Sequence, residues 1–265
     1  MSVPDKIINK IKEKVLHTKD YKYVSDHNLP LKLSDHIVLY NLEDTWKIIP
    51  LTIALSYPII YDKCTVNNEV YNVTIVVCPV TLRSNMFKGI FEFETYQNYT
   101  MILKEKDSDS LIAIDLGYKM DKKYIVEQNR RSEIKLLNLR SALISSPDAQ
   151  FMITSVDTYP IMDIDYYSSV KDIKGKELDC LVHPKTLVYI IQYKSYDETT
   201  EKLAIILGRD MNKFTVTGYD VKKSGLFEYL GKYRQKIINR GGYIMPMLWY
   251  FAKDIYKTAK VVYVI

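Results

Sequence analysis

The stretch VTIVVCPVTLRS, residues 73–84, contains a cysteine thiol, Cys78, at the point where a strand-like apolar run meets a proline. A thiolate can act as a nucleophile or a redox centre when its surroundings stabilise the anion. Free cysteine also packs as a small, buried apolar side chain. Both interpretations are open from the sequence, and the choice depends on where the neighbouring elements place Cys78.

Other residues that could carry chemistry form no recognisable motif. The three cysteines, Cys64, Cys78 and Cys180, lack CxxC spacing, which argues against a disulfide framework and against a zinc site. Cys180 and His183 are close enough in sequence to suggest a nucleophile and its base. They are an odd number of positions apart, however, so a strand would turn them to opposite faces. The chain has no GxxxxGK[ST], GxGxxG or HExxH motif. The sequence therefore predicts no metal and no cofactor.

Composition narrows the range of partners. The chain of 265 residues has 37 Lys and Arg against 32 Asp and Glu, a net charge of +5, and its basic residues are spread along the sequence. Phosphate binding requires positive charge gathered on one face, so a nucleic-acid role is the weakest alternative. No apolar run approaches the roughly 18 residues of a membrane span, and the start lacks a signal-peptide core. We therefore expect no membrane span and a cytosolic location.

The pattern along the chain predicts an α+β fold. Isoleucines at helical spacing after Pro4 predict a helix over residues 4–17, followed by a polar extended arm, so that residues 1–35 precede the main domain. From residue 36, short runs rich in β-branched and aromatic residues alternate with turn signals. They predict one β-rich domain, residues 36–265, with an antiparallel meander or barrel-like core. A few helices are expected at residues 50–57, 228–240 and 245–259.

The segment that contains Cys78 is predicted to be the second strand of a hairpin. Asn67 and Asn68 suit a two-residue turn, because asparagine tolerates the positive φ angles of such turns. The pairs that this turn implies are Val66 with Glu69 and Cys64 with Tyr71. Pro79 cannot donate a ladder hydrogen bond, so the strand should end beside Cys78.

Residues 49–84, IPLTIALSYPIIYDKCTVNNEVYNVTIVVCPVTLRS, resemble the hallmark of the domain-of-unknown-function family numbered 3179. That hallmark is close to YPLxxLxxHExVND, a short hairpin and VTYCPLxxxA. The matching residues are Pro50 and Leu51, Asp62, and the run Cys78, Pro79 and Val80. The resemblance extends more loosely over residues 36–260 and implies a divergent member with the family's fold. Because the family has no assigned reaction, the resemblance implies no activity.

The chain departs from the family pattern at positions that could carry chemistry. Tyr57 stands where the family has His, Pro58 replaces its Glu, and Tyr61 replaces its Asn. Thr81 occupies the position of a second Cys. Metal binding or thiol chemistry would lack these partners here.

Two functions are expected from these observations. The first is a non-catalytic structural or protein-interaction protein, in a larger assembly or a homo-oligomer, because tyrosine, present 23 times, is common in protein interfaces. The bias toward Tyr, Lys, Ile and Asn indicates a coding sequence rich in A and T, as in large DNA viruses, some protists and some bacteria, and a virion component is the setting we expect. The alternative is a small-molecule-binding or thiol-dependent redox enzyme. Its pocket would be lined by Tyr57, Asp62, Cys78, Thr81 and Ser84.

Overall fold

The structure is a computed structural model, and its chain divides into two compact units, Met1–Ile164 and Asp165–Ile265. The residues that the structure describes are 3–25, 30–42, 44–66, 68–97, 99–108, 110–114, 134–162, 164–169, 171, 187–194, 201–207, 243–251 and 260–263.

The first unit begins with the predicted helix, which is shorter than expected. Helix α1 spans Asp5–Glu13, because the chain turns at Lys14 and continues as the short strand β1, Val15–Leu16. Part of the predicted arm is also a strand, β2, Tyr21–Val24, which pairs with β12. The helix predicted to residue 17 is therefore wrong at Val15 and Leu16, and within the predicted extended arm Tyr21–Val24 are extended as a paired strand.

A five-stranded sheet has the order β11-β3-β4-β12-β2. Its remaining strands are β3 (His36–Leu42), β4 (Thr45–Pro50), β11 (Ile134–Asn138) and β12 (Gln150–Thr154). Helix α2, Leu51–Ser56, follows β4 directly and confirms the helix predicted there. Helix α3, Leu139–Ser145, follows β11 and is capped by Asn138, whose side chain accepts the Ser141 N–H at 2.7 Å.

A four-stranded sheet, order β1-β5-β6-β7, contains the predicted hairpin. Its longer strands are β5 (Ile59–Val66), β6 (Glu69–Val77) and β7 (Ser84–Lys88). The predicted register is confirmed, with Val66 opposite Glu69 and Cys64 opposite Tyr71. Asn68 has the expected positive φ of 67°. Strand β6 ends just before Cys78, as the following proline predicts.

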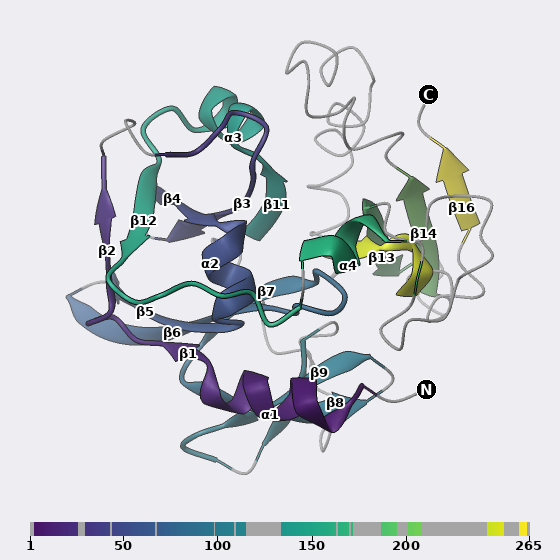
Figure 1. Ribbon diagram of the computed structural model, residues 1–265, viewed down its shortest axis with the longest axis horizontal. Coiled ribbons are helices and arrows are strands. Elements are labelled where there is room, and N and C mark those ends of the chain that lie inside the picture. The colour runs from purple at the N-terminus through teal and green to yellow at the C-terminus, as the bar shows by residue number, and fades with distance from the viewer. Residues whose placement is uncertain are drawn as a thin grey trace. The chain divides into compact units, whose positions relative to one another are not determined.

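The third sheet of this unit, order β10-β9-β8, follows β7 in the chain. Its strands are β8 (Phe91–Gln97), β9 (Thr100–Glu105) and β10 (Leu111–Ala113). Within the first unit, the four-stranded sheet lies between the five-stranded sheet on one side and β8, β9 and α1 on the other (Figure 1). Ile59, Ile60 and Asp62 of β5 and residues 73–77 of β6 are therefore buried, whereas the side chains of β6 near the hairpin turn are largely exposed.

The second unit contains helix α4 from its second residue onward and a four-stranded sheet of order β15-β13-β14-β16. The bounds are Ile164–Ser168 for α4, Leu187–Lys194 for β13, Glu201–Leu207 for β14, Tyr243–Leu248 for β15 and Lys260–Tyr263 for β16. The helix expected from residue 245 is wrong over its first four residues, because this segment pairs with β13 along its whole length. The helix expected at 228–240, and Cys180 and His183, lie outside the described residues.

The predicted α+β class is confirmed. The fold is rich in strands, most pairs are antiparallel, and an N-terminal helix and a few short helices accompany them. In the described part of the chain the sheets are open, so the barrel-like closure is not formed there. The boundaries proposed from the sequence, 1–35 and 36–265, stay a prediction.

Candidate functional site

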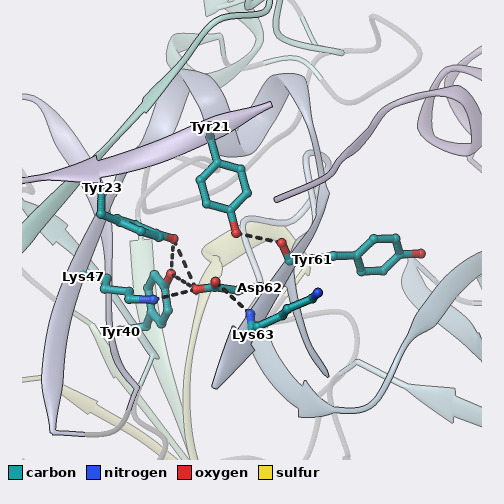
Figure 2. Close-up of polar contacts among 7 residues, drawn as sticks. All are labelled: Tyr21, Tyr23, Tyr40, Lys47, Tyr61, Asp62 and Lys63. Carbon is teal, nitrogen blue, oxygen red and sulfur yellow. Dashed lines mark hydrogen bonds and ion pairs between the residues drawn. The ribbon is translucent and has the colours of Figure 1, made fainter. Parts of the chain in front are cut away.

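Asp62 lies at the centre of a polar cluster between two sheets. Its residue is only 6% exposed, and three side chains from the five-stranded sheet converge on its carboxylate (Figure 2). Lys47 Nζ lies 2.9 Å from Oδ2 and forms an ion pair with it. The Tyr40 hydroxyl donates to the same oxygen at 2.9 Å, and the Tyr23 hydroxyl donates at 3.4 Å. The other oxygen, Oδ1, accepts the Lys63 N–H at 2.8 Å.

The partners of Asp62 also contact one another. The hydroxyls of Tyr23 and Tyr40 also contact each other; because each carries one proton, Tyr40 donates to Asp62 and the Tyr23 proton is shared between the Tyr40 oxygen and Asp62. The Lys47 ammonium lies 4.3 Å from the centre of the Tyr23 ring. This distance fits a cation–π contact, so the Lys47 ammonium interacts with both the Tyr23 ring and the Asp62 carboxylate. Strands β2, β3 and β4 each supply one partner, and the cluster therefore ties three strands of one sheet to β5 of another.

The tyrosines of this cluster hold their protons tightly. Burial raises the pKa of Tyr40 well above its usual value, and the nearby Tyr23 and Asp62 raise it further. Burial and then the Asp62 charge raise the pKa of Tyr23 and of Tyr21. A phenol that stays protonated is a hydrogen-bond donor and cannot serve as a general base near neutral pH. The cluster is thus built to surround a carboxylate with donors.

Strand β1 pairs with the outer side of β5 at Ile59 and Ile60, and beyond β1 side chains contact the open backbone groups of β5. The Tyr21 hydroxyl donates to the Tyr61 carbonyl at 2.7 Å, and Asp62 accepts the Lys63 N–H as described above. At β7, the opposite edge of the sheet, Asn85 Oδ1 similarly accepts the Met86 N–H at 2.8 Å. Side chains that occupy edge N–H and C=O groups hinder pairing with a strand of another chain.

Cys78 lies in a tight turn between β6 and β7 and is fully buried. Its backbone N–H donates to the Arg83 carbonyl at 2.7 Å, and its carbonyl accepts the Leu82 N–H at 2.9 Å. Its Sγ lies 3.3 Å from the Tyr96 hydroxyl and accepts the Thr81 N–H at 3.4 Å. The thiol is thus enclosed by β8 and by its own turn.

The five residues of the predicted pocket do not converge on one point. Cys78 and Thr81 meet in the turn, but strand alternation places Asp62 on the opposite face of the hairpin from Cys78. Ser84 pairs with Val77 in the ladder, and its buried hydroxyl has no hydrogen-bond partner within the described residues. The Tyr57 hydroxyl donates to the Asp157 carbonyl at 2.7 Å.

Sequence reasoning identified Asp62 but missed its partners Tyr21, Tyr23, Tyr40 and Lys47. Tyr21 and Tyr23 are two positions apart, a spacing that puts both rings on one face of a strand. This spacing is visible in the sequence, but it does not indicate that the two tyrosines face Asp62. Tyr40 lies in a predicted strand, but Lys47 lies in β4, which was not predicted, and the pairing of the two residues comes only from the sheet register.

No group of three or more His, Cys, Asp or Glu side chains is placed to hold a metal ion among the residues that the structure describes. The same part of the chain contains no helix with the length and apolar character needed to cross a membrane.

Comparison with known proteins finds no counterpart for this architecture. No protein-family model, no curated protein and no solved structure matches the chain. The resemblance to the family numbered 3179 accordingly stays a prediction.

Proposed function

We propose that the protein is a non-catalytic structural or protein-interaction protein, a component of a larger assembly. The observation that carries the proposal is that the carboxylate of Asp62, the acidic residue matched in the family resemblance, is fully bound by groups of the same chain. Both carboxylate oxygens are engaged by Lys47, by two tyrosine hydroxyls and by a backbone N–H. A carboxylate with this many internal donors stabilises the fold and has little capacity left for a substrate.

The neighbourhood of Cys78 supports the same proposal. The thiol is buried, and its contacts are with Tyr96 and with its own turn. Free cysteine in such surroundings packs as a small apolar side chain. The tyrosine-rich composition supplies amphipathic rings for interfaces, and its bias keeps the assembly of a large DNA virus as the proposed setting.

The experiment is isolation of the tagged full chain from its source under native conditions, followed by measurement of particle mass. We expect the chain to be recovered in a particle heavier than its own 31.0 kDa. An unrelated tagged protein of similar net charge serves as the control for charge-driven association. Recovery as a monomer with no associated protein would contradict the proposal.

A second candidate, thiol-dependent chemistry, is favoured by one contact. The Thr81 N–H donates a hydrogen bond to Cys78 Sγ, and this backbone donor holds the sulfur in place within the turn. The test is alkylation of the native protein across pH, with Cys78→Ser used to assign the signal. A rate no faster than that of a small-molecule thiol would eliminate this candidate.

A further inference from the structure

Lys47 and Asp62 are an amine and a carboxyl group held in direct contact. Lys47 lies in β4 and Asp62 in β5, and Lys47 Nζ lies 2.9 Å from Asp62 Oδ2 (Figure 2). Their side chains are only 13% and 8% exposed. An amine and a carboxyl group can condense to an amide with loss of water, and this pair needs no further reactant to do so.

The fold supplies the proximity that such a condensation requires. Groups held in a reacting geometry behave as if each were present at an effective concentration of about 10⁵–10⁸ M. The ladders of two different sheets fix the backbone at the two residues, because Lys47 pairs with Tyr40 and Asp62 pairs with Val73. The two side chains therefore meet as a consequence of folding, without a further step of association.

Burial favours the amide over the ion pair. The centre of the Tyr23 ring lies 4.3 Å from the Lys47 ammonium, and Tyr40, which donates to Asp62, is fully buried. Charges enclosed in this way are poorly hydrated, so transfer of one proton from Lys47 to Asp62 removes two costly charges. The transfer leaves a neutral amine, which is the form of lysine that attacks a carbonyl carbon. The amide that results is neutral and costs less to bury than two ions.

The hydrogen bonds of Asp62 give its two oxygens different roles. Oδ1 accepts the Lys63 N–H at 2.8 Å, and a fixed backbone donor of this kind stabilises an oxygen on which negative charge develops. Oδ2 accepts the Tyr40 hydroxyl at 2.9 Å and is also the oxygen that contacts Lys47. Oδ1 is therefore placed to remain as the amide oxygen, and Oδ2 is placed to leave as water.

We propose that Lys47 and Asp62 form an intramolecular amide bond that links β4 to β5. Nζ first passes one proton to Oδ2 across their contact. The electron pair of Nζ then attacks Cγ, which forms the N–C bond and moves one electron pair of the carbonyl group onto Oδ1. A second proton passes from Nζ to Oδ2, the Cγ–Oδ2 bond breaks as the carbonyl group re-forms, and water leaves. Nζ keeps one hydrogen, and one positive and one negative charge disappear together, so the net charge of the chain is unchanged.

The first test is the intact mass of the purified full chain under denaturing conditions. We expect a mass lower than that of the sequence by one water molecule. Lys47→Arg is the matched control, because its guanidinium keeps a cation beside Asp62 but stays protonated and does not attack. This variant should have the full mass of its own sequence, and circular dichroism checks that it folds. A native chain of full mass would overturn the proposal, and so would a deficit that remains in Lys47→Arg.

Digestion with trypsin locates the bond. Trypsin cleaves after lysine and arginine, so an unlinked chain gives one peptide that ends at Lys47 and a second that ends at Lys63. An amide at Nζ removes the charge that trypsin recognises at Lys47. We therefore expect a single peptide of residues 33–63, lighter than its sequence by one water molecule. Separate peptides of residues 33–47 and 48–63 from the native chain would overturn the proposal.

The rate of bond formation tests the role of the Tyr40 hydroxyl. The mass of a freshly synthesised chain is followed with time, and Tyr40→Phe, which removes one donor to Oδ2, should slow the loss of water about tenfold or more. Tyr61→Phe is the matched control: Tyr61 is adjacent to Asp62, but its hydroxyl bonds to Phe91 on the other face of β5, so the rate should not change. Equal rates for the two variants would overturn the role of Tyr40 in the condensation.

This inference does not rest on the proposed function, and the experiments separate the two. A chain that lacks the bond, yet is recovered from its source in a particle with other proteins, overturns the bond and leaves the interaction role standing. A linked chain that is recovered as a monomer does the reverse.

Discussion

Tyr61 and Asp62 are adjacent in β5 and point to opposite faces of the four-stranded sheet, where the two faces are held by different kinds of contact. On the Asp62 face, a buried ion pair and two phenol donors join β5 to the five-stranded sheet. On the Thr74 face, which includes Tyr61 and Cys78, neutral hydrogen bonds join the sheet to residues 89–97.

The two faces differ in how much free energy of unfolding is lost when one hydrogen-bonding or ion-pair partner is removed. Thr74 Oγ1 donates to the Gly89 carbonyl at 2.7 Å and accepts the Phe91 N–H at 3.1 Å. Each neutral bond of this kind contributes about 1 kcal/mol net. A buried charge costs several kcal/mol when its partner is removed. The Asp62 face should therefore be the more sensitive of the two to substitution.

The largest effect is expected for Asp62→Ala. This change leaves the Lys47 ammonium, which is only 13% exposed, without its carboxylate, and it removes the acceptor of two tyrosine hydroxyls. The expected loss in the free energy of unfolding is about 3–5 kcal/mol. Urea unfolding followed by circular dichroism measures it.

Lys47→Met is the matched control for this prediction. It removes the other half of the ion pair but leaves Asp62 with three donors, namely Tyr23, Tyr40 and the Lys63 N–H. It should cost less than Asp62→Ala. Equal losses would mean that the ion pair, and not the full set of donors, stabilises this face.

Thr74→Val is expected to have the next largest effect, about 1–3 kcal/mol, because it removes the hydroxyl partner of the buried Phe91 N–H and of the partly buried Gly89 carbonyl. Thr74→Ser keeps the hydroxyl and should cost less. A loss from Thr74→Val as large as that from Asp62→Ala would remove the proposed difference between the faces. The midpoint of urea unfolding provides the comparison.

Alkaline pH offers a third comparison. The raised pKa of Tyr40 exceeds that of a tyrosine in the unfolded chain, which is about 10, because burial disfavours the phenolate. The folded state therefore keeps a proton that the unfolded chain releases. The resulting stability is present in full below about pH 10 and is lost as the pH rises above it. On the other face, burial raises the pKa of Tyr61 to about 12, followed by the effect of Glu92.

We expect phenolate absorbance to show Tyr61 ionising in the folded protein with a pKa of about 12, while Tyr40 ionises only as the protein unfolds. Tyr40→Phe should reduce the fall of the unfolding free energy above pH 10 by about 1.4 kcal/mol per pH unit. Thr74→Val carries no titrating group and should leave that slope unchanged. If Tyr40→Phe leaves the pH dependence of the unfolding free energy unchanged above pH 10, the pKa of Tyr40 is not higher in the folded protein than in the unfolded chain.

The parts of this arrangement that the sequence predicts are local. The register of the hairpin follows from two asparagines and the alternation of the strands around them, so Val66 and Glu69 could be paired correctly. Strand β2 was missed because it has only four residues and pairs with β12, about 130 residues later in the chain. The predicted pocket placed Asp62 and Cys78 together, although the alternation of the hairpin puts them on opposite faces, and no local signal assigns Tyr23, Tyr40 and Lys47 to Asp62.

The smallest effect is expected for Tyr61→Phe, about 0.5–1.5 kcal/mol, because the ring keeps its contact with His17 and loses one hydrogen bond of 3.2 Å to the Phe91 carbonyl. The Thr74 and Tyr61 hydroxyls bind the N–H and the carbonyl of the same residue, Phe91. Their substitutions should therefore be non-additive, with a coupling of about 0.5 kcal/mol or more in a double-mutant cycle. Strict additivity would mean that the Thr74 face consists of independent bonds. Coupling would mean that it, like the Asp62 face, acts as one unit built from weaker contacts.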